Sequence, residues 1–181
     1  KAHSGRRIGS CPVSDRDAAA VLADVNRGLV GSSWDRVRND ENASWFGHFV
    51  SAIVLAVGLR PIEHMDSGVR FRAGEEFLAK VVVFTDKTII FADASGPAGS
   101  ADKVEMAVVA HPRAGLAQLS ITDAASAFER DAFDSWPGDF KVTAEWAHGT
   151  KVTFPLGPIE FDEQRARFVD LYAALSAALG E

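Results

Sequence analysis

The residue types most suited to chemistry gather in one connection of the chain, residues 123–139. Its five carboxylates are Asp123, Glu129, Asp131, Asp134 and Asp139. Carboxylate oxygens are the ligands that Ca²⁺ and Mg²⁺ prefer, but the spacing lacks the alternating pattern and central glycine of a calcium-binding loop. A cation site is therefore the weakest of the interpretations of this segment.

Aromatic side chains are interleaved with these acids. Phe128, Phe133 and Trp136 either dock on the protein's own core or anchor a partner protein, because buried aromatic residues carry much of the binding energy of interfaces. As partner-binding candidates the sequence offers Phe128, Asp131, Phe133, Asp134 and Trp136.

The patterns typical of metal or nucleophilic catalysis are missing. The five histidines are His3, His48, His64, His111 and His148. No two of them form a His-x-x-x-His motif, the chain has no Gly-x-Ser-x-Gly motif, and Cys11 lies in a poor context for a nucleophile. We therefore expect no catalytic residue, metal or cofactor; an enzyme would need carboxylates of residues 123–139 to converge with His111 or His148.

Composition limits the class of partner. The 181 residues carry a formal net charge of −6, whereas nucleic acids and anionic membranes are bound by clustered basic surfaces. We expect neither as a partner. A single cysteine makes an internal disulfide impossible and favours a reducing cytoplasm.

Helical periodicity dominates the first third of the chain. Residues 1–13 read as a flexible lead and residues 14–60 as a helical segment, in which Asp17 is suited to cap a helix. The stretch WFGHFVSAIVLAVGL, residues 45–59, is about 22 Å long as a helix, too short for a hydrocarbon core of about 30 Å. We expect no integral membrane segment, and His48 is predicted to be a core histidine. A buried strand is the alternative for the second half of this stretch.

Strand patterns fill residues 66–181. FLAKVVVFTDKTIIFADA predicts a hairpin with its turn at Asp86-Lys87, and FKVTAEWAHGTKVTFPL predicts a second hairpin that turns at His148-Gly149. The final segment predicts a helix capped by Asp162 and ended by Gly180. Its apolar stripe is Phe168, Leu171, Tyr172, Leu175 and Leu179. Six strands are clear, and a seventh is expected from residues 69–72 or from the long connection.

Residues from about 75 to 180 resemble bacterial pleckstrin-homology-like domains, which are seven-strand sandwiches or barrels capped by a helix. The resemblance lies in VVVFTDKTIIFAD, which is similar to the first hairpin of that family, and in VTAEWAHGTKVTFPL leading into DEQRARFVDLYAAL. It implies phosphoinositide binding, but only Lys80 and Lys87 lie near this turn, so peptide or protein recognition is favoured.

The sequence thus predicts an α+β protein: a helical segment, residues 14–60, packed on an antiparallel pleckstrin-homology-like sandwich, residues 66–181, with a C-terminal helix. We expect a non-catalytic binding module for a protein or peptide partner. One alternative is a carrier of a small apolar ligand, with a cavity between the residue 45–59 helix and the sheet. Homodimerisation through that helix is a further alternative.

Overall fold

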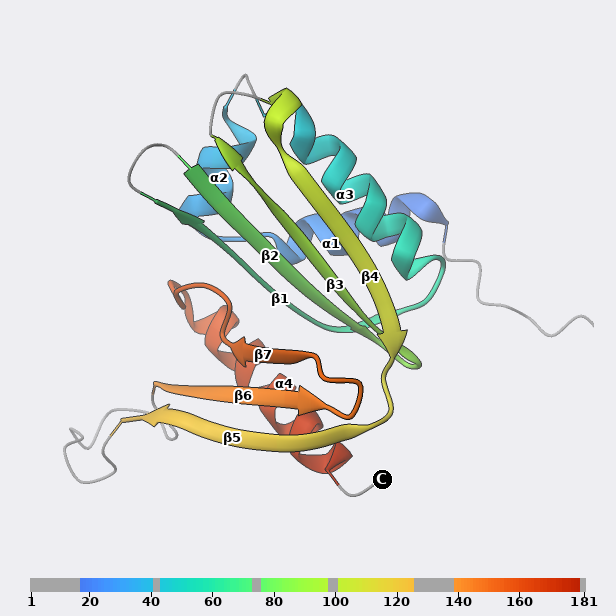
Figure 1. Cartoon of the computed structure of the whole chain (residues 1–181), viewed down its shortest axis with the longest axis vertical. Helices are drawn as coiled ribbons and strands as arrows, with labels where there is room; N and C mark the ends of the chain where they lie inside the picture. Colours follow the sequence, from blue (N-terminus) through green and yellow to red (C-terminus); the bar gives the residue numbers. More distant parts are fainter. Residues whose placement is uncertain (1–16, 41–42, 73–75, 98–100, 126–138, 180–181) are drawn as a thin grey trace, which may run out of the picture.

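The structure is a computed structural model that describes residues 17–40, 43–72, 76–97, 101–125 and 139–179. The predicted lead, residues 1–13, and Gly180 lie outside these ranges. The described residues form an α+β fold with a four-stranded and a three-stranded antiparallel sheet and four α-helices (Figure 1). The predicted fold class is confirmed at this level.

Three helices precede the sheets: α1 (Ala18–Gly28), α2 (Ser32–Arg38) and α3 (Ser44–Val57). Asp17 caps α1 as predicted, since its Oδ1 accepts a hydrogen bond of 2.8 Å from the N–H of Ala20. The apolar stretch near residue 50 is helical, so the strand alternative for its second half is wrong.

Sheet A contains β1 (Ile62–Phe71), β2 (Glu76–Thr85), β3 (Thr88–Pro97) and β4 (Glu105–Pro112), in that order across the sheet. A short 3₁₀ helix, η1 (Ala101–Lys103), precedes β4. The hairpin predicted to turn at Asp86-Lys87 is confirmed as β2–β3. It is the second hairpin and not the first, because β1 pairs ahead of it and supplies the seventh strand.

Sheet B contains β5 (Leu116–Ala124), β6 (Phe140–Trp146) and β7 (Lys151–Phe154). Gly149, with φ of 91°, makes the predicted turn between β6 and β7. Helix α4 (Asp162–Ala178) follows. The expectation that Asp162 caps α4 is wrong, because it is the first helical residue; the Gln164 side chain instead accepts hydrogen bonds from the N–H groups of Glu160 and Phe161.

The first core lies between sheet A and the N-terminal helices. Side chains alternate across a strand, so odd-numbered residues of β2, such as Phe77, face the helices. Trp45 of α3 stacks on Phe77 with ring centroids 4.5 Å apart. The buried core contributed by α3 is Trp45, Phe49, Val50, Ile53 and Val57. The long apolar stretch therefore covers one face of the sheet.

The opposite side of α3 is turned to solvent. His48 is exposed, and 82% of Leu55 is accessible. The prediction of a core histidine at position 48 is wrong, because the helix buries one stripe and His48 lies outside it.

The second core lies between the other face of sheet A, sheet B and α4. Sheet A contributes Val82, Phe84 and Ile89; sheet B contributes Val142, Ala144, Trp146 and Phe154; α4 contributes Phe168, Leu171 and Leu175. Phe168 packs on Phe140 with ring centroids 4.6 Å apart. The terminal helix therefore closes the sandwich as predicted, although Leu179 of the expected stripe follows the helix and is partly exposed.

Truncating side chains in α4 and directly after it should measure how much the packing of this helix contributes to stability. Phe168→Ala removes a ring that is only 6% exposed, and we expect a loss of about 3–5 kcal/mol in the free energy of unfolding. Leu179→Ala, at a side chain that is 39% exposed, should cost less than about 1 kcal/mol. Urea denaturation measures both, and equal losses would contradict the assignment of Phe168 to the core.

Candidate functional site

The partner-binding residues predicted from sequence, Phe128, Asp131, Phe133, Asp134 and Trp136, lie outside the described residues. Two carboxylates at the ends of their connection are described. Asp123 forms an ion pair of 3.0 Å with Lys141, and Asp139 one of 2.7 Å with Arg165. Both carboxylates are thus engaged by basic side chains of neighbouring elements.

Two of the histidines meet, but away from these carboxylates. His111 and His148 stack with ring centroids 4.3 Å apart. They lie where β5 begins, since Leu116 pairs with Trp146 next to His148, whereas Asp123 pairs with Lys141 at the opposite end of sheet B. The described residues therefore do not bring the acidic connection and the histidines into one cleft.

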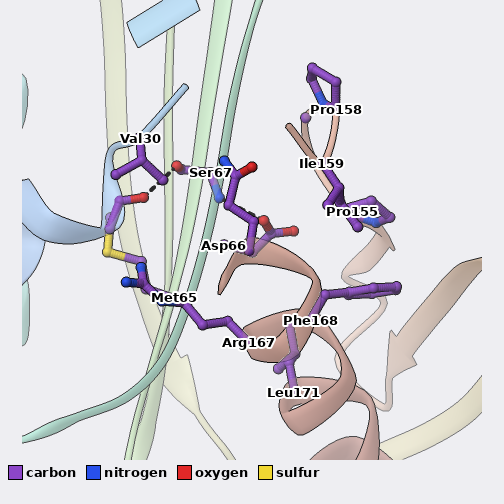
Figure 2. Close-up of a pocket in the computed structure, with 13 residues that line it drawn as sticks. Val30, Met65, Asp66, Ser67, Pro155, Pro158, Ile159, Arg167, Phe168 and Leu171 are labelled. Atoms are coloured by element: carbon purple, nitrogen blue, oxygen red, sulfur yellow. Dashed lines mark hydrogen bonds between the residues drawn. The ribbon is translucent and has the colours of Figure 1, made fainter. Parts of the chain in front are cut away.

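A small polar cavity lies where β1 meets α1, α4 and residues 155–159. Figure 2 shows Asp66 and Ser67 facing this cavity, with Phe168 and Leu171 of α4 at its base. Its volume is about 40 Å³, which is room for a few water molecules and not for an organic ligand. The polar groups around the cavity therefore matter for the fold, because their hydrogen bonds join several segments of the chain.

The hydrogen bonds at this cavity join four elements. Asp66 Oδ2 accepts a bond of 2.8 Å from the N–H of Leu156, and Oδ1 accepts one of 2.9 Å from the N–H of Ser67. Ser67 Oγ donates to the carbonyl of Gly28 and accepts from the indole N–H of Trp34. Asp66 and Ser67 thus connect α1, α2 and the segment after β7 to one strand.

Burial of the Asp66 carboxyl shifts its pKa. Loss of solvation raises its pKa to about 6, and the two backbone N–H donors oppose that rise. Desolvation disfavours the ionised form of a carboxyl, whereas hydrogen bonds donated to a carboxylate favour it. For Asp66 the loss of solvation is the larger effect, so its pKa is raised.

The segment after β7 crosses β1 at a point where the backbones touch. A Cβ on Gly68 would lie 2.5 Å from the carbonyl oxygen of Leu156, closer than real Cβ contacts occur. Glycine is required here for close approach rather than for an unusual backbone angle. The crossing places β7 against the inner face of sheet A, the face directed at sheet B.

A larger groove begins at this crossing. It has a volume of about 380 Å³ and runs between β7 and the part of the inner face of sheet A that sheet B leaves uncovered. Its lining from sheet A includes Arg70, Leu78, Lys80, Phe91 and Asp93. Lys151, Val152 and Thr153 of β7 form the opposite wall. We call this the β7 groove.

The wall formed by β7 is the free edge of a strand. β7 is the last strand of sheet B and pairs only with β6 among the described residues (Figure 1). The N–H of Trp146 donates to the carbonyl of Thr150, and backbone bonding alternates along an antiparallel pair. The N–H and C=O groups of Lys151 and Thr153 therefore point away from β6.

Sequence reasoning missed the Asp66 cavity and the β7 groove. Residues 62–71 contain two acids, a serine and a glycine, and only four of the ten residues are apolar, which gives a weak strand signal. No local pattern indicates that Asp66 faces Leu156, since 90 residues separate them. The free edge of β7 likewise depends on the order of strands in sheet B.

No protein-family model, curated protein or solved structure matched this chain. The helices of the described residues include none with the length and apolarity needed to cross a membrane. Within the same described ranges, no three His, Cys, Asp or Glu side chains gather in a way that would hold a metal ion.

Replacing Asp66 should change how stability depends on pH. The native pKa of about 6 lies above the ordinary value of 3.8, so the folded state binds the proton more tightly than the unfolded state. The contribution of Asp66 is greatest below pH 4 and falls by up to about 3 kcal/mol as pH rises to about 6. Asp66→Asn keeps the shape of the side chain and removes this dependence.

The measurement is urea denaturation of both proteins at several pH values between 4 and 7. The free energy of unfolding of the wild-type protein should fall relative to that of Asp66→Asn across this interval and then run parallel to it. A constant difference between the two proteins would show that the native pKa of Asp66 is not raised.

Two glycine substitutions should change the free energy of unfolding in opposite directions. Gly68→Ala places a methyl group against the Leu156 carbonyl and should cost about 1–3 kcal/mol of unfolding free energy. Gly47→Ala on α3 meets no atom within 4 Å and should raise it by about 0.5–1 kcal/mol, because alanine favours the helix. Thermal unfolding compares them; a neutral Gly68→Ala would contradict the tight crossing.

Proposed function

We propose that this protein is a non-catalytic binding module that recognises an extended segment of a partner protein or peptide. The segment adds a strand to the free edge of β7. The single observation that carries this proposal is the β7 groove, which places outward backbone groups of β7 opposite an uncovered part of sheet A.

Strand addition supplies affinity through main-chain hydrogen bonds and specificity through alternate side chains. The outward N–H and C=O groups of Lys151 and Thr153 offer the hydrogen bonds. The added strand would extend sheet B over the uncovered part of sheet A, about 10 Å above it, which is the usual spacing of packed sheets. Its inward side chains would then contact Leu78 and Lys80.

The edge of β4 is a poorer site for this purpose. The N–H of Arg113 donates to the carbonyl of Lys87, so alternation along β4 directs positions 110 and 112 outward. Pro112 lacks the N–H that an added strand would need, which is a common way of protecting an exposed edge. The β7 edge carries no such residue between Lys151 and Phe154.

A relationship to pleckstrin-homology-like domains is part of the proposal. Two antiparallel sheets with seven strands in total, followed by a terminal helix, support this relationship. A cytoplasmic site of action rests on the single cysteine and remains a prediction. The proposal of peptide recognition depends on the β7 groove and not on this relationship.

The test removes one outward N–H from β7. A library of random peptides displayed on phage is selected against the full chain, and the enriched peptides are then measured against Thr153→Pro by fluorescence anisotropy. Proline at an outward edge position leaves the bonds to β6 intact but removes a donor to the added strand. We expect binding to weaken by at least about tenfold, which corresponds to about one to two hydrogen bonds.

Two variants control for other effects of this substitution. Thr153→Val loses the hydroxyl that bonds to Thr143 but keeps the backbone N–H, and Ala110→Pro introduces proline at the outward edge of β4. Both should bind the peptides as the wild-type protein does. Failure to enrich any peptide, or equal binding by Thr153→Pro with its fold intact by circular dichroism, would overturn the proposal.

A further inference from the structure

The β7 groove is basic, although the chain as a whole is acidic. Its floor on sheet A carries Arg70 and Lys80 against the single carboxylate Asp93, and Lys151 lies at its rim, whereas the net charge of the chain is −6. A local field of opposite sign to the whole molecule favours ligands of complementary charge and steers them to the site.

The register of sheet A explains why these cations lie together. Lys80 pairs with Gly68 on β1 and with Asp93 on β3. Arg70 pairs with Leu78, two residues further along, so its side chain lies on the same face as that of Lys80. Both therefore project from the uncovered part of sheet A toward the position of a strand added to β7.

These cations are only loosely engaged within the protein. Lys80 lies 3.5 Å from Asp93, with both side chains about half exposed, and Lys151 lies 3.6 Å from Glu145. Exposed pairs of this kind contribute little and are readily exchanged. The Arg70 side chain forms no ion pair or hydrogen bond with the residues that the structure describes. The groove can therefore pair with new carboxylates at little cost.

Apolar surface accompanies the charge. Leu78, Phe91 and Val152 line the groove and are each partly buried. Because side chains alternate in a strand, an added segment would direct every second residue at this floor and at Lys80 and Arg70. The lining thus suits a segment in which acidic residues flank an apolar one on the same face.

We propose that the segment bound at β7 is an acidic extended peptide of a partner protein, with Asp or Glu at alternate positions on either side of an apolar residue. The inference rests on the proposed function and adds the chemical class of the ligand. Its carboxylates pair with Arg70 and Lys80, and its apolar side chain packs on Leu78 and Phe91.

The experiment compares charge variants against an enriched acidic peptide and its counterpart in which every Asp and Glu is replaced by Asn and Gln. The double variant Arg70→Gln/Lys80→Gln should bind the acidic peptide roughly three- to thirtyfold more weakly. The matched control, Lys87→Gln/Lys103→Gln, removes the same charge outside the groove and should change binding less than about twofold. Raising the salt concentration should weaken binding of the acidic peptide and not of its amide counterpart.

The outcomes separate this inference from the proposed function. Peptides that lose binding on Thr153→Pro, carry no excess of Asp or Glu and bind Arg70→Gln/Lys80→Gln unchanged would contradict the charge preference and leave strand addition standing. A library without any binder would contradict strand addition and the charge preference together. An acidic excess at alternate positions, lost when the library is selected against Arg70→Gln/Lys80→Gln, supports the inference.

Discussion

Burial of sheet A on both faces is the constraint on which the rest of the structure depends. Residues of β2 and β3 alternate between two cores: Val81 and Val83 face the N-terminal helices, while Val82 and Phe84 face sheet B and α4. A strand that is apolar on both faces cannot be left half covered, since each exposed Val or Phe forfeits about 1.5–3 kcal/mol. Helices on one side and a second sheet on the other satisfy this requirement.

Coverage by sheet B is incomplete, and the uncovered part differs in chemistry. The strands of sheet A near the β2–β3 turn carry Phe84 and Ile89 on the inner face, which are buried, whereas Lys80 and Asp93 further along are exposed to about half. The side chains therefore change from apolar to charged where β7 ends the second sheet. This boundary creates the β7 groove, so the proposed site follows from the same constraint as the core.

The two sheets are held in their relative position by the crossing of residues 155–157 over β1. Asp66 binds the N–H of Leu156, and Gly68 allows the backbones to meet. A carboxyl whose pKa is raised by burial is a costly way to satisfy an N–H group, because its ionised form is disfavoured there. It fixes the position of β7 next to sheet A, and the free edge of β7 is a defined wall as a result.

Local sequence patterns were sufficient for the elements that carry strong periodicity. The period of WFGHFVSAIVLAVGL determined a helix with one buried stripe, and the alternation around Asp86-Lys87 and His148-Gly149 determined two hairpins. Phe168 and Leu175 on one stripe of the last helix were enough to predict that it closes the sandwich. These features depend on residues within a few positions of one another.

Only the tertiary structure decided which edges stay free and what lies beside them. β1 is weakly patterned and becomes a strand because β2 pairs with it, and His48 is exposed because α3 lies flat on one side of sheet A. Arg70, Lys80 and Lys151 come from three strands, and Asp66 meets Leu156 across 90 residues of sequence. Such contacts depend on strand order and sheet packing, which no local period encodes.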